Sequence, residues 1–355
     1  MTEDRVLALG IETSCDDTAC AVVDNEGRVL STVVSSQLAA HRPYGGVVPE
    51  IASREHLRNW PPVSESALAE AKVSIEEIDV IAATKGPGLI GALLVGLSIG
   101  KAIAYSLQKS FQAVHHLEGH LYSPFLTEDG GIAAQIPDEF LGLVVSGGHT
   151  SLFEMTEGAA KTLAETRDDA MGEVFDKVGK RLGLAYPQGP RVDELAELGA
   201  DQRFVLAIAR CSDGSLDFSY SGLKSQTILE IQNLEAAGVD TNLGDLEIRD
   251  IPEPVLDLLA GFRVAAVEQI IERLNRWRKT RAIEVLAVSG GVAANRLLRR
   301  RLEGWAQEHQ VDLRLVPLRY AGDNAAMIAH AALLRKGWGW EDDPLSTDAA
   351  SRIPL

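Results

Sequence analysis

The chain has 355 residues and a formal net charge of −17, with 51 acidic side chains against 34 basic ones. This acidic balance disfavours binding to nucleic acid by bulk electrostatics, so any contact with RNA needs a local basic patch or a partner protein. The 46% hydrophobic and 24% charged residues are typical of a globular protein, and the length suits about two domains.

Cysteine content and hydropathy indicate the compartment. Cys15, Cys20 and Cys211 are too few for a disulfide framework and form no C-x-x-C pair, which favours a reduced, cytoplasmic setting. The chain starts with an acidic segment, so we expect no signal peptide. No uninterrupted apolar stretch reaches the ~18 residues of a membrane-spanning helix, so we expect no membrane partner.

The first predicted elements are three strands, at 6–11, 19–24 and 29–36, joined by short turns as in a β-meander. The first turn, Gly10–Thr18, is rich in hydroxyl and carboxylate groups. Such a turn could present donors to a phosphate and an acid to a metal ion or water. An ordinary polar hairpin would have the same composition.

The next predicted elements are helical. A helical pattern over 53–72 should be broken into two helices by Pro61 and Pro62. A strand at 78–84 then leads through the glycine-rich turn Lys85–Gly91 into an apolar helix. The free backbone N–H groups at that helix N-terminus could bind an anion.

The most informative motif follows a short strand at 111–114 and spans His115–His120. His116 and His120 are four residues apart, so on a helix both imidazoles lie on one face and can share one metal ion. Glu118 does not directly follow the first histidine, as the general base of an H-E-x-x-H peptidase must. The pair therefore predicts two metal ligands that need a third, although two packing histidines would show the same spacing.

The second half of the chain repeats the order of elements in the first. Three strands and a helix are predicted at 140–145, 151–155, 161–166 and 170–182. We therefore predict two duplicated lobes, residues 1–138 and 139–323, with a substrate cleft between them. The C-terminal helix region, 324–355, should pack back on the first lobe.

Further polar turns occur near the C-terminus. Asp323 lies in the segment Gly322–Asn324 at the N-terminus of a helix predicted at 325–335, where a carboxylate is favoured by the helix dipole, so capping alone would account for it. Three predicted strand ends carry glycine-rich polar turns, at Lys85–Gly91, Ser146–Thr150 and Ser289–Asn295. Because ligands of α/β sheets bind at the carboxyl ends of strands, these turns and the histidine pair together predict a binding site.

These motifs occur in the order of one known family. The matching segments are Gly10–Thr18, Tyr44–Ser53, Gly86–Gly96, His115–His120, Ser146–Thr150, Glu173–Lys177, Ser219–Lys224, Ser289–Arg296 and Asp323–Ala329. Over nearly its full length the chain resembles the tRNA N6-adenosine threonylcarbamoyltransferases, formerly described as O-sialoglycoprotein endopeptidases. The resemblance implies an α/β actin/Hsp70-like (ASKHA) fold, in which two duplicated RNase H-like lobes surround a central cleft.

The resemblance also implies the residues of the site. His116 and His120 would bind one divalent metal ion with Asp323 as the third ligand, iron(II) in the first place and zinc(II) as the second choice. Two imidazoles and one carboxylate with open positions suit either ion. Asp16 matches a position associated with catalysis. The implied substrate contacts are Val144, Val145, Ser146, Gly147, Gly148, Asp176, Gly189, Asp193 and Asn295.

The implied reaction transfers the threonylcarbamoyl group of threonylcarbamoyl-AMP to the N6 amine of the adenosine next to the anticodon, in tRNAs that read codons starting with A. Bacterial members work with a catalytically inactive paralogous subunit and a small P-loop ATPase, so we expect these partners. The arginines at 296, 299, 300 and 301 form either a candidate RNA patch or a solvated helix face. Competing hypotheses are a related carbamoyltransferase with another acceptor, an ATPase or sugar kinase of the same fold, and the inactive paralogue, which lacks the histidine pair.

Overall fold

The computed structural model describes residues 5–128, 131, 134–211, 213–244 and 246–355. The chain divides into two compact units. Unit 1 contains residues 1–138, 156–160 and 316–355, and unit 2 contains residues 139–155 and 161–315. Asp323, predicted to end the second lobe, therefore lies in the same unit as the histidine pair.

Unit 1 is built on a six-stranded sheet with the strand order β5-β4-β1-β2-β3-β6. The strands are β1 (Leu7–Glu12), β2 (Asp17–Asp24), β3 (Arg28–Ser36), β4 (Val80–Gly86), β5 (Ser110–His115) and β6 (Thr127–Glu128). The first three pair antiparallel and form the predicted meander, and β4 and β5 extend the sheet in parallel with β1. β1 and β4 are almost entirely buried, as expected for strands covered on both faces.

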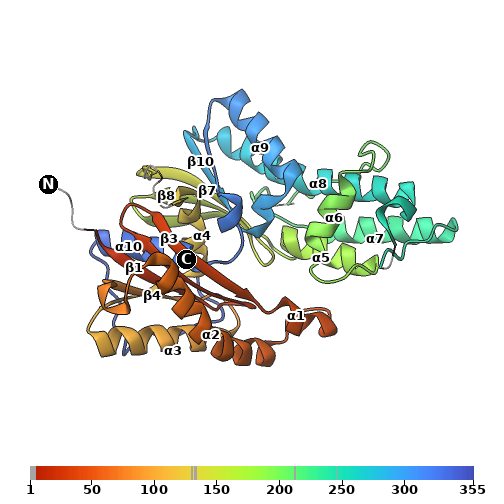
Figure 1. Cartoon of the computed structure of the whole chain (residues 1–355). Coiled ribbons are helices and arrows are strands. Elements are labelled where there is room, and N and C mark those ends of the chain that lie inside the picture. Colours follow the sequence, from red (N-terminus) through yellow and green to blue (C-terminus); the bar gives the residue numbers. More distant parts are fainter. Residues whose placement is uncertain (1–4, 129–130, 132–133, 212, 245) are drawn as a thin grey trace. The chain divides into compact units, whose positions relative to one another are not determined.

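Helices cover both faces of this sheet (Figure 1). The helices of this unit are α1 (Leu38–His41), α2 (Pro49–Ala71), α3 (Ile90–Leu107), α4 (His116–Tyr122) and α10 (Ala325–Gly337), and α2, α3 and α10 pack on the sheet. An added Cβ at Gly10 would lie 2.1 Å from the carbonyl oxygen of Ala325, so this residue of β1 faces α10. The next residue, Ile11, packs against Gly96 and Gly100 of α3. Since neighbouring strand residues point to opposite faces, α3 and α10 lie on opposite sides of the sheet.

Helix α2 runs through Pro61 and Pro62 without interruption, so the predicted break is wrong. A proline inside a helix costs ~3 kcal/mol or more because it removes a hydrogen bond and crowds the preceding turn. Both rings are exposed to solvent, whereas Ala52, Val63 and Ala67 are buried. Packing of this buried face against β2 and β3, on both sides of the prolines, offsets that cost.

Unit 2 repeats the architecture of unit 1. Its sheet has the order β11-β10-β7-β8-β9, which corresponds strand for strand to β5-β4-β1-β2-β3. The strands are β7 (Glu139–Val145), β8 (Thr150–Thr156), β9 (Ala159–Glu165), β10 (Val285–Ser289) and β11 (Asp312–Leu315). β10 pairs in parallel with both β7 and β11, as β4 does with β1 and β5. The predicted duplication is confirmed.

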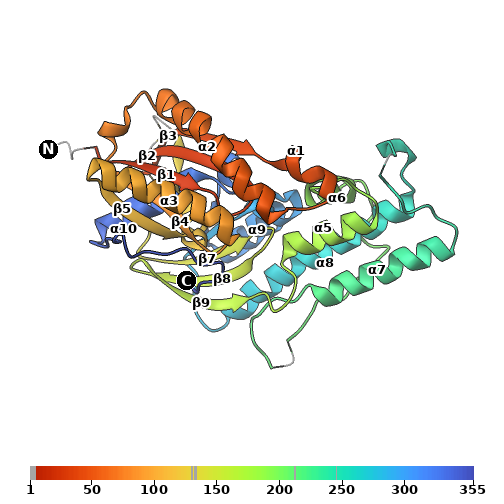
Figure 2. The ribbon, with the colours of Figure 1, turned by 90° about the horizontal axis from the view of Figure 1, so that it is seen from below.

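Helix α8 is the central helix of unit 2 (Figure 2). The helices of this unit are α5 (Met171–Arg181), α6 (Gly189–Ala196), α7 (Ser221–Ala236), α8 (Glu253–Arg278) and α9 (Arg296–His309). α8 packs against α6, α7 and α9, and α5 packs against α6 and α7. The buried face of α8 is largely apolar but includes two arginines, Arg263 and Arg273.

Among the described residues, one helix, α3, is long and apolar enough to cross a membrane by length and composition. A single helix of this kind is weak evidence for a membrane span, because the core helix of a soluble protein passes the same test. In this fold α3 packs against β4 and α2.

His330, on α10, is a buried polar residue. It is 4% exposed, and neither ring nitrogen has a hydrogen-bond partner within the described residues. Its Cε1 atom would lie 2.8 Å from a Cβ added to Gly27, so the ring packs on the β2–β3 turn. Burial lowers the pKa of His330 to about 4, against ~6.5 for an unfolded chain.

Between pH ~6.5 and ~4 the unfolded chain binds a proton at this position that the folded chain excludes. The free energy of unfolding should therefore fall by up to ~3 kcal/mol as pH drops through this window, and level off below it. His330→Leu should remove this share of the acid sensitivity. Urea unfolding of both proteins at pH 8 and pH 4.5 would test this, with pH 8 as the control because the ring is neutral there in both states. An unchanged pH dependence in the variant would contradict the prediction.

Candidate functional site

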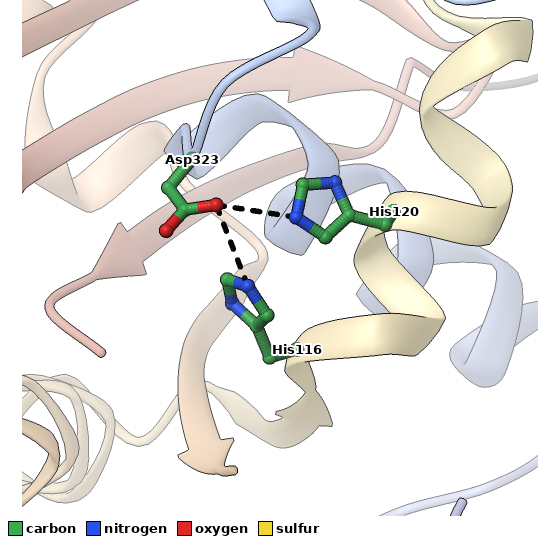
Figure 3. A group of neighbouring side chains, drawn as sticks. All are labelled: His116, His120 and Asp323. Atoms are coloured by element: carbon green, nitrogen blue, oxygen red, sulfur yellow. Dashed lines mark hydrogen bonds and ion pairs between the residues drawn. The ribbon is translucent and has the colours of Figure 1, made fainter. Parts of the chain in front are cut away.

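Two histidines and one carboxylate of unit 1 lie close together at the N-terminus of α4 (Figure 3). Nε2 of His116 is 3.4 Å and Nε2 of His120 is 3.2 Å from the same oxygen, Oδ1 of Asp323. One ligand atom from each residue lies within 4.8 Å of the others. The spacing predicted from the sequence is thus present on a helix, and the third side chain comes from a distant segment of the chain.

Asp323 does not cap α10, so capping does not explain its position. The N-cap of that helix is Asn324, whose Oδ1 accepts a hydrogen bond from the backbone N–H of Met327 at 3.0 Å. The carboxylate of Asp323 is therefore free to face the two imidazoles. Its side chain is 30% exposed, against 7% for His116 and 0% for His120, so the group opens to solvent on the carboxylate side.

The ring of His116 is oriented by contacts on its other nitrogen. Nδ1 lies 3.3 Å from Oε2 of Glu12 and 3.3 Å from Oγ of Ser14. Glu12 is itself fixed, because its carboxylate accepts hydrogen bonds from the backbone N–H of Ser14 and the hydroxyl of Thr84. A carboxylate on Nδ1 that leaves Nε2 for a metal ion is the usual arrangement around a metal-binding histidine.

His120 is fully buried, and its Nε2 is the nitrogen that faces Asp323. Both histidines thus present Nε2 toward the same carboxylate oxygen. Two imidazole nitrogens and a carboxylate oxygen that converge in a partly open pocket fit a divalent transition metal ion. These residues could hold such an ion without a further protein ligand.

Burial and the neighbouring charges determine the pKa values of His116, His120 and Asp323. Burial alone would lower the pKa of His116, but Asp323 and Glu12 outweigh it and raise this pKa to about 10. Burial lowers the pKa of His120. The pKa of Asp323 lies well below its usual value, because the two histidines outweigh the effect of burial. A metal ion would therefore compete with a proton at His116, and its affinity should rise with pH.

Asp16, the predicted catalytic residue, lies in the turn between β1 and β2 and is half-buried. Its backbone carbonyl accepts a hydrogen bond from the N–H of Gln37 at 3.0 Å. Within the described part of the chain, no hydrogen bond or ion pair joins the Asp16 carboxylate to the histidines or to Asp323. Its catalytic role stays a prediction.

In unit 2, Asp176 and Gly189 lie together at the junction of α5 and α6. Oδ1 of Asp176 accepts hydrogen bonds from the backbone N–H groups of Gln188 (3.0 Å) and Gly189 (2.7 Å). This carboxylate therefore fixes the N-terminus of α6. Burial raises the pKa of Asp176, although these two hydrogen bonds act against it.

A second carboxylate of unit 2, Asp193, is held by two polar side chains. Its Oδ1 accepts hydrogen bonds from Nδ2 of Asn295 at 2.7 Å and from Nη1 of Arg263 at 3.2 Å. Arg263 is 6% exposed and also donates to the carbonyl of Ala196 at the end of α6 and to Glu197. The predicted residues Asp193 and Asn295 are thus in direct contact.

The strand-end turns of unit 2 also lie side by side. A Cβ added to Gly290 would be 2.3 Å from the carbonyl oxygen of Val145, and one added to Gly172 would be 2.7 Å from that of Ser146. The predicted segment Val144–Gly148 therefore contacts both the turn that follows β10 and the N-terminal end of α5.

Sequence reasoning missed Glu12, Ser14 and Arg263. Glu12 and Ser14 belong to a turn already noted for its polar groups, and a glutamate at the end of a fully apolar strand was the available signal. For Arg263 the signal was a charge within the apolar stretch 258–267 of a long helix. A charge in such a position requires a buried partner.

Comparisons with known proteins identify the family. The TsaD family model, described as tRNA N6-adenosine threonylcarbamoyltransferase, matches residues 28–330. The tRNA N6-adenosine threonylcarbamoyltransferase of Syntrophobacter fumaroxidans is 45% identical over 349 residues, which cover 98% of this chain and 99% of that protein. That of Burkholderia ambifaria is 44% identical over 333 residues, 94% of this chain and 93% of that protein. The chain belongs to this family. It is therefore a transferase.

Solved structures at low sequence identity support the fold. HypF of T. kodakarensis superposes with a TM-score of 0.59 at 14% identity, covering 94% of this chain and 48% of that one. Component A of the (R)-2-hydroxyglutaryl-CoA dehydratase of Acidaminococcus fermentans has a TM-score of 0.51 at 13% identity, covering 94% and 99%. With the duplicated strand order, these similarities confirm the predicted actin/Hsp70-like fold.

Glu12→Gln tests the orientation of His116. The amide keeps the shape of the carboxylate but loses its charge, so metal affinity should fall by about tenfold while the fold is retained. Calorimetric titration with zinc(II) would measure the change. Asp24→Asn is a matched control, since Asp24 is an equally buried carboxylate at the opposite end of the β1–β2 pair. An equal loss of affinity in both variants would argue against a specific role for Glu12.

Proposed function

We propose that this chain transfers the threonylcarbamoyl group from threonylcarbamoyl-AMP to the N6 amine of the adenosine next to the anticodon, in tRNAs that read codons starting with A. The observation that carries the proposal is a complete His–His–Asp donor set in a chain 45% identical to proteins named for this activity. The amine nitrogen attacks the carbamoyl carbon, the bond from that carbon to the AMP phosphate oxygen breaks, AMP leaves with the electron pair, and the amine loses a proton.

His116, His120 and Asp323 would hold one divalent ion, iron(II) or zinc(II). When bound, the ion would supply Lewis acidity toward the phosphate or carbamoyl oxygens of the donor. Glu12 would keep the His116 ring in a fixed tautomer and orientation, because its carboxylate is fixed by neighbouring hydrogen bonds. The solvent-exposed edge of Asp323 is the side from which donor oxygens would enter.

The polar groups of unit 2 would bind the donor. Asp193, held by Asn295 and Arg263, presents a charged acceptor suited to hydroxyl groups of ribose or threonine. The glycine-rich turn Val144–Gly148 offers backbone N–H groups near the end of β7. Asp16, in the β1–β2 turn of unit 1, would orient the attacking amine or accept its proton.

The proposed setting is the cytoplasm, with tRNA, the inactive paralogous subunit and the small P-loop ATPase as partners. The acidic net charge of −17 supports the need for a partner in tRNA binding. A partner that contributes a basic surface would add the electrostatic attraction that this chain lacks.

His116→Ala should abolish transfer, because it removes one of the three donor atoms. Alanine is a strong helix former, so α4 and the fold should be retained. The measurement is nucleoside analysis of tRNA incubated with the protein, its partners, threonine, bicarbonate and ATP. His330→Leu is the control, since it changes a buried histidine of the same unit whose ring nitrogens have no hydrogen-bond partner among the described residues. If the His116 variant forms as much threonylcarbamoyladenosine as the native chain, the metal site is rejected. If the native chain forms no threonylcarbamoyladenosine with active partners, the proposed acceptor is rejected.

Asp193→Asn should raise the KM for threonylcarbamoyl-AMP by about tenfold, because one charge-assisted hydrogen bond to a ligand hydroxyl contributes ~1.5 kcal/mol or more. The amide preserves the shape and can still pair with Asn295. Steady-state kinetics with purified donor would give KM and kcat separately. Metal affinity, measured in parallel, should not change because Asp193 lies in unit 2. A native KM would remove Asp193 from the donor site.

A further inference from the structure

Residues 340–353, here called the strap, follow α10 and return to strand β5. The side-chain amide of Gln112 donates a hydrogen bond to the carbonyl of Trp340. The backbone N–H of Ala113 donates to the carboxylate of Asp342 at 3.0 Å. These contacts attach the first part of the strap to the strand that leads into the histidine helix α4.

The last part of the strap packs on the glycine-rich turn after β4. The N–H of Ala350 donates to the carbonyl of Lys85 at 2.9 Å, and the N–H of Gly88 donates to the carbonyl of Ser351 at 3.3 Å. A Cβ added to Gly86 would lie only 2.1 Å from the carbonyl oxygen of Ala350, and Gly86 has a φ of +149°. The close approach therefore requires glycine at this position.

His115 links the strap to α4. Its Nδ1 accepts a hydrogen bond from the backbone N–H of Leu117 at 3.1 Å, which makes its ring the N-cap of the helix. Because Nδ1 is the acceptor, Nε2 carries the proton in the neutral ring and donates to the carbonyl of Ile353 at 3.1 Å. One buried ring thus joins the strap to the first turn of the helix that carries His116 and His120.

A second series of hydrogen bonds leads from the strap to the imidazole of His116. The turn that the strap holds continues into Leu89, whose N–H donates to the carbonyl of Ser14 at 2.8 Å. The hydroxyl of Ser14 is 3.3 Å from Nδ1 of His116. Two short series of hydrogen bonds therefore connect the strap to this imidazole, one through His115 to the first turn of α4 and one through the turn after β4 to Ser14.

We propose that the strap positions the metal centre, and that His115 is the positioning residue through which it acts. The inference rests on the metal site of the proposed function. His115 touches neither the ion nor the substrate in this account. It fixes the first turn of α4, and with it the separation and direction of the two imidazoles, by accepting from that turn and donating to Ile353.

His115→Asn separates the two contacts of this residue. Asparagine is a good N-cap and can still accept from Leu117, but it is too short to reach the carbonyl of Ile353. We expect cobalt(II) to bind about tenfold more weakly and with an altered visible absorption spectrum, which reports the ligand geometry. Thermal unfolding of the metal-free protein should stay close to native. His330→Leu is the matched control and should bind cobalt(II) as the native chain does.

Ala350→Pro tests the strap without changing His115. Proline lacks the N–H that donates to Lys85, so this end of the strap should detach from the turn. Asp348→Pro is its control, since Asp348 is exposed and its N–H has no hydrogen bond within the described residues. We expect Ala350→Pro to weaken cobalt(II) binding as His115→Asn does, and Asp348→Pro to leave it unchanged.

Native cobalt(II) affinity and spectrum in both His115→Asn and Ala350→Pro would overturn the inference and leave the metal site standing. Failure of the native chain to bind cobalt(II) would overturn the inference together with the metal site. If His115→Asn does not fold, the pair of proline variants decides the question. The inference is supported if Ala350→Pro binds cobalt(II) more weakly and Asp348→Pro does not. Equal cobalt(II) affinity in the two proline variants overturns it.

Discussion

The close packing of helix α10 on the backbone of strand β1 determines where the site forms. Gly10 allows this approach, because any side chain there would collide with the carbonyl of Ala325. α10 begins two residues after Asp323, so docking the helix also fixes this carboxylate. Its partner His120 is 203 positions away in the sequence. A larger residue at position 10 would displace α10 and move the Asp323 carboxylate away from the imidazoles, although the three donor residues themselves would be unchanged.

The two units share a sheet topology but carry different polar groups. In unit 1, β5 leads directly into a seven-residue helix that carries both histidines. In unit 2, the carboxylate of Asp193 is held instead by Asn295 and Arg263. Duplication explains why glycine-rich polar turns follow both β4 and β10, and divergence of the residues explains why the histidine pair is in unit 1 and the contact of Asp193 with Asn295 is in unit 2.

The repeated meander, the parallel strands and the histidine pair could be predicted because each depends on local periodicity or spacing. The uninterrupted helix through Pro61 could not, since packing against the sheet overrides the local cost of the ring. Asp323 and Asn324 are adjacent and both are good capping residues, so the sequence cannot say which one caps α10. Glu12 was missed for a related reason: its partner, His116, is 104 positions away and is brought near by the fold alone.

Three of the four arginines of α9 limit how the proposed tRNA substrate could be bound. Arg299 donates to the carbonyl of Ala293 at 2.8 Å, and Arg300 and Arg301 pair with Glu197 and Glu268. Guanidinium groups already engaged within the chain contribute little to counterion release from a polyanion. A chain with a net charge of −17 would repel the tRNA backbone at long range, so we expect the proposed partners to supply the basic surface for the encounter. The proposed partners would then determine how strongly tRNA binding depends on salt. This chain would determine which atom of the tRNA is modified.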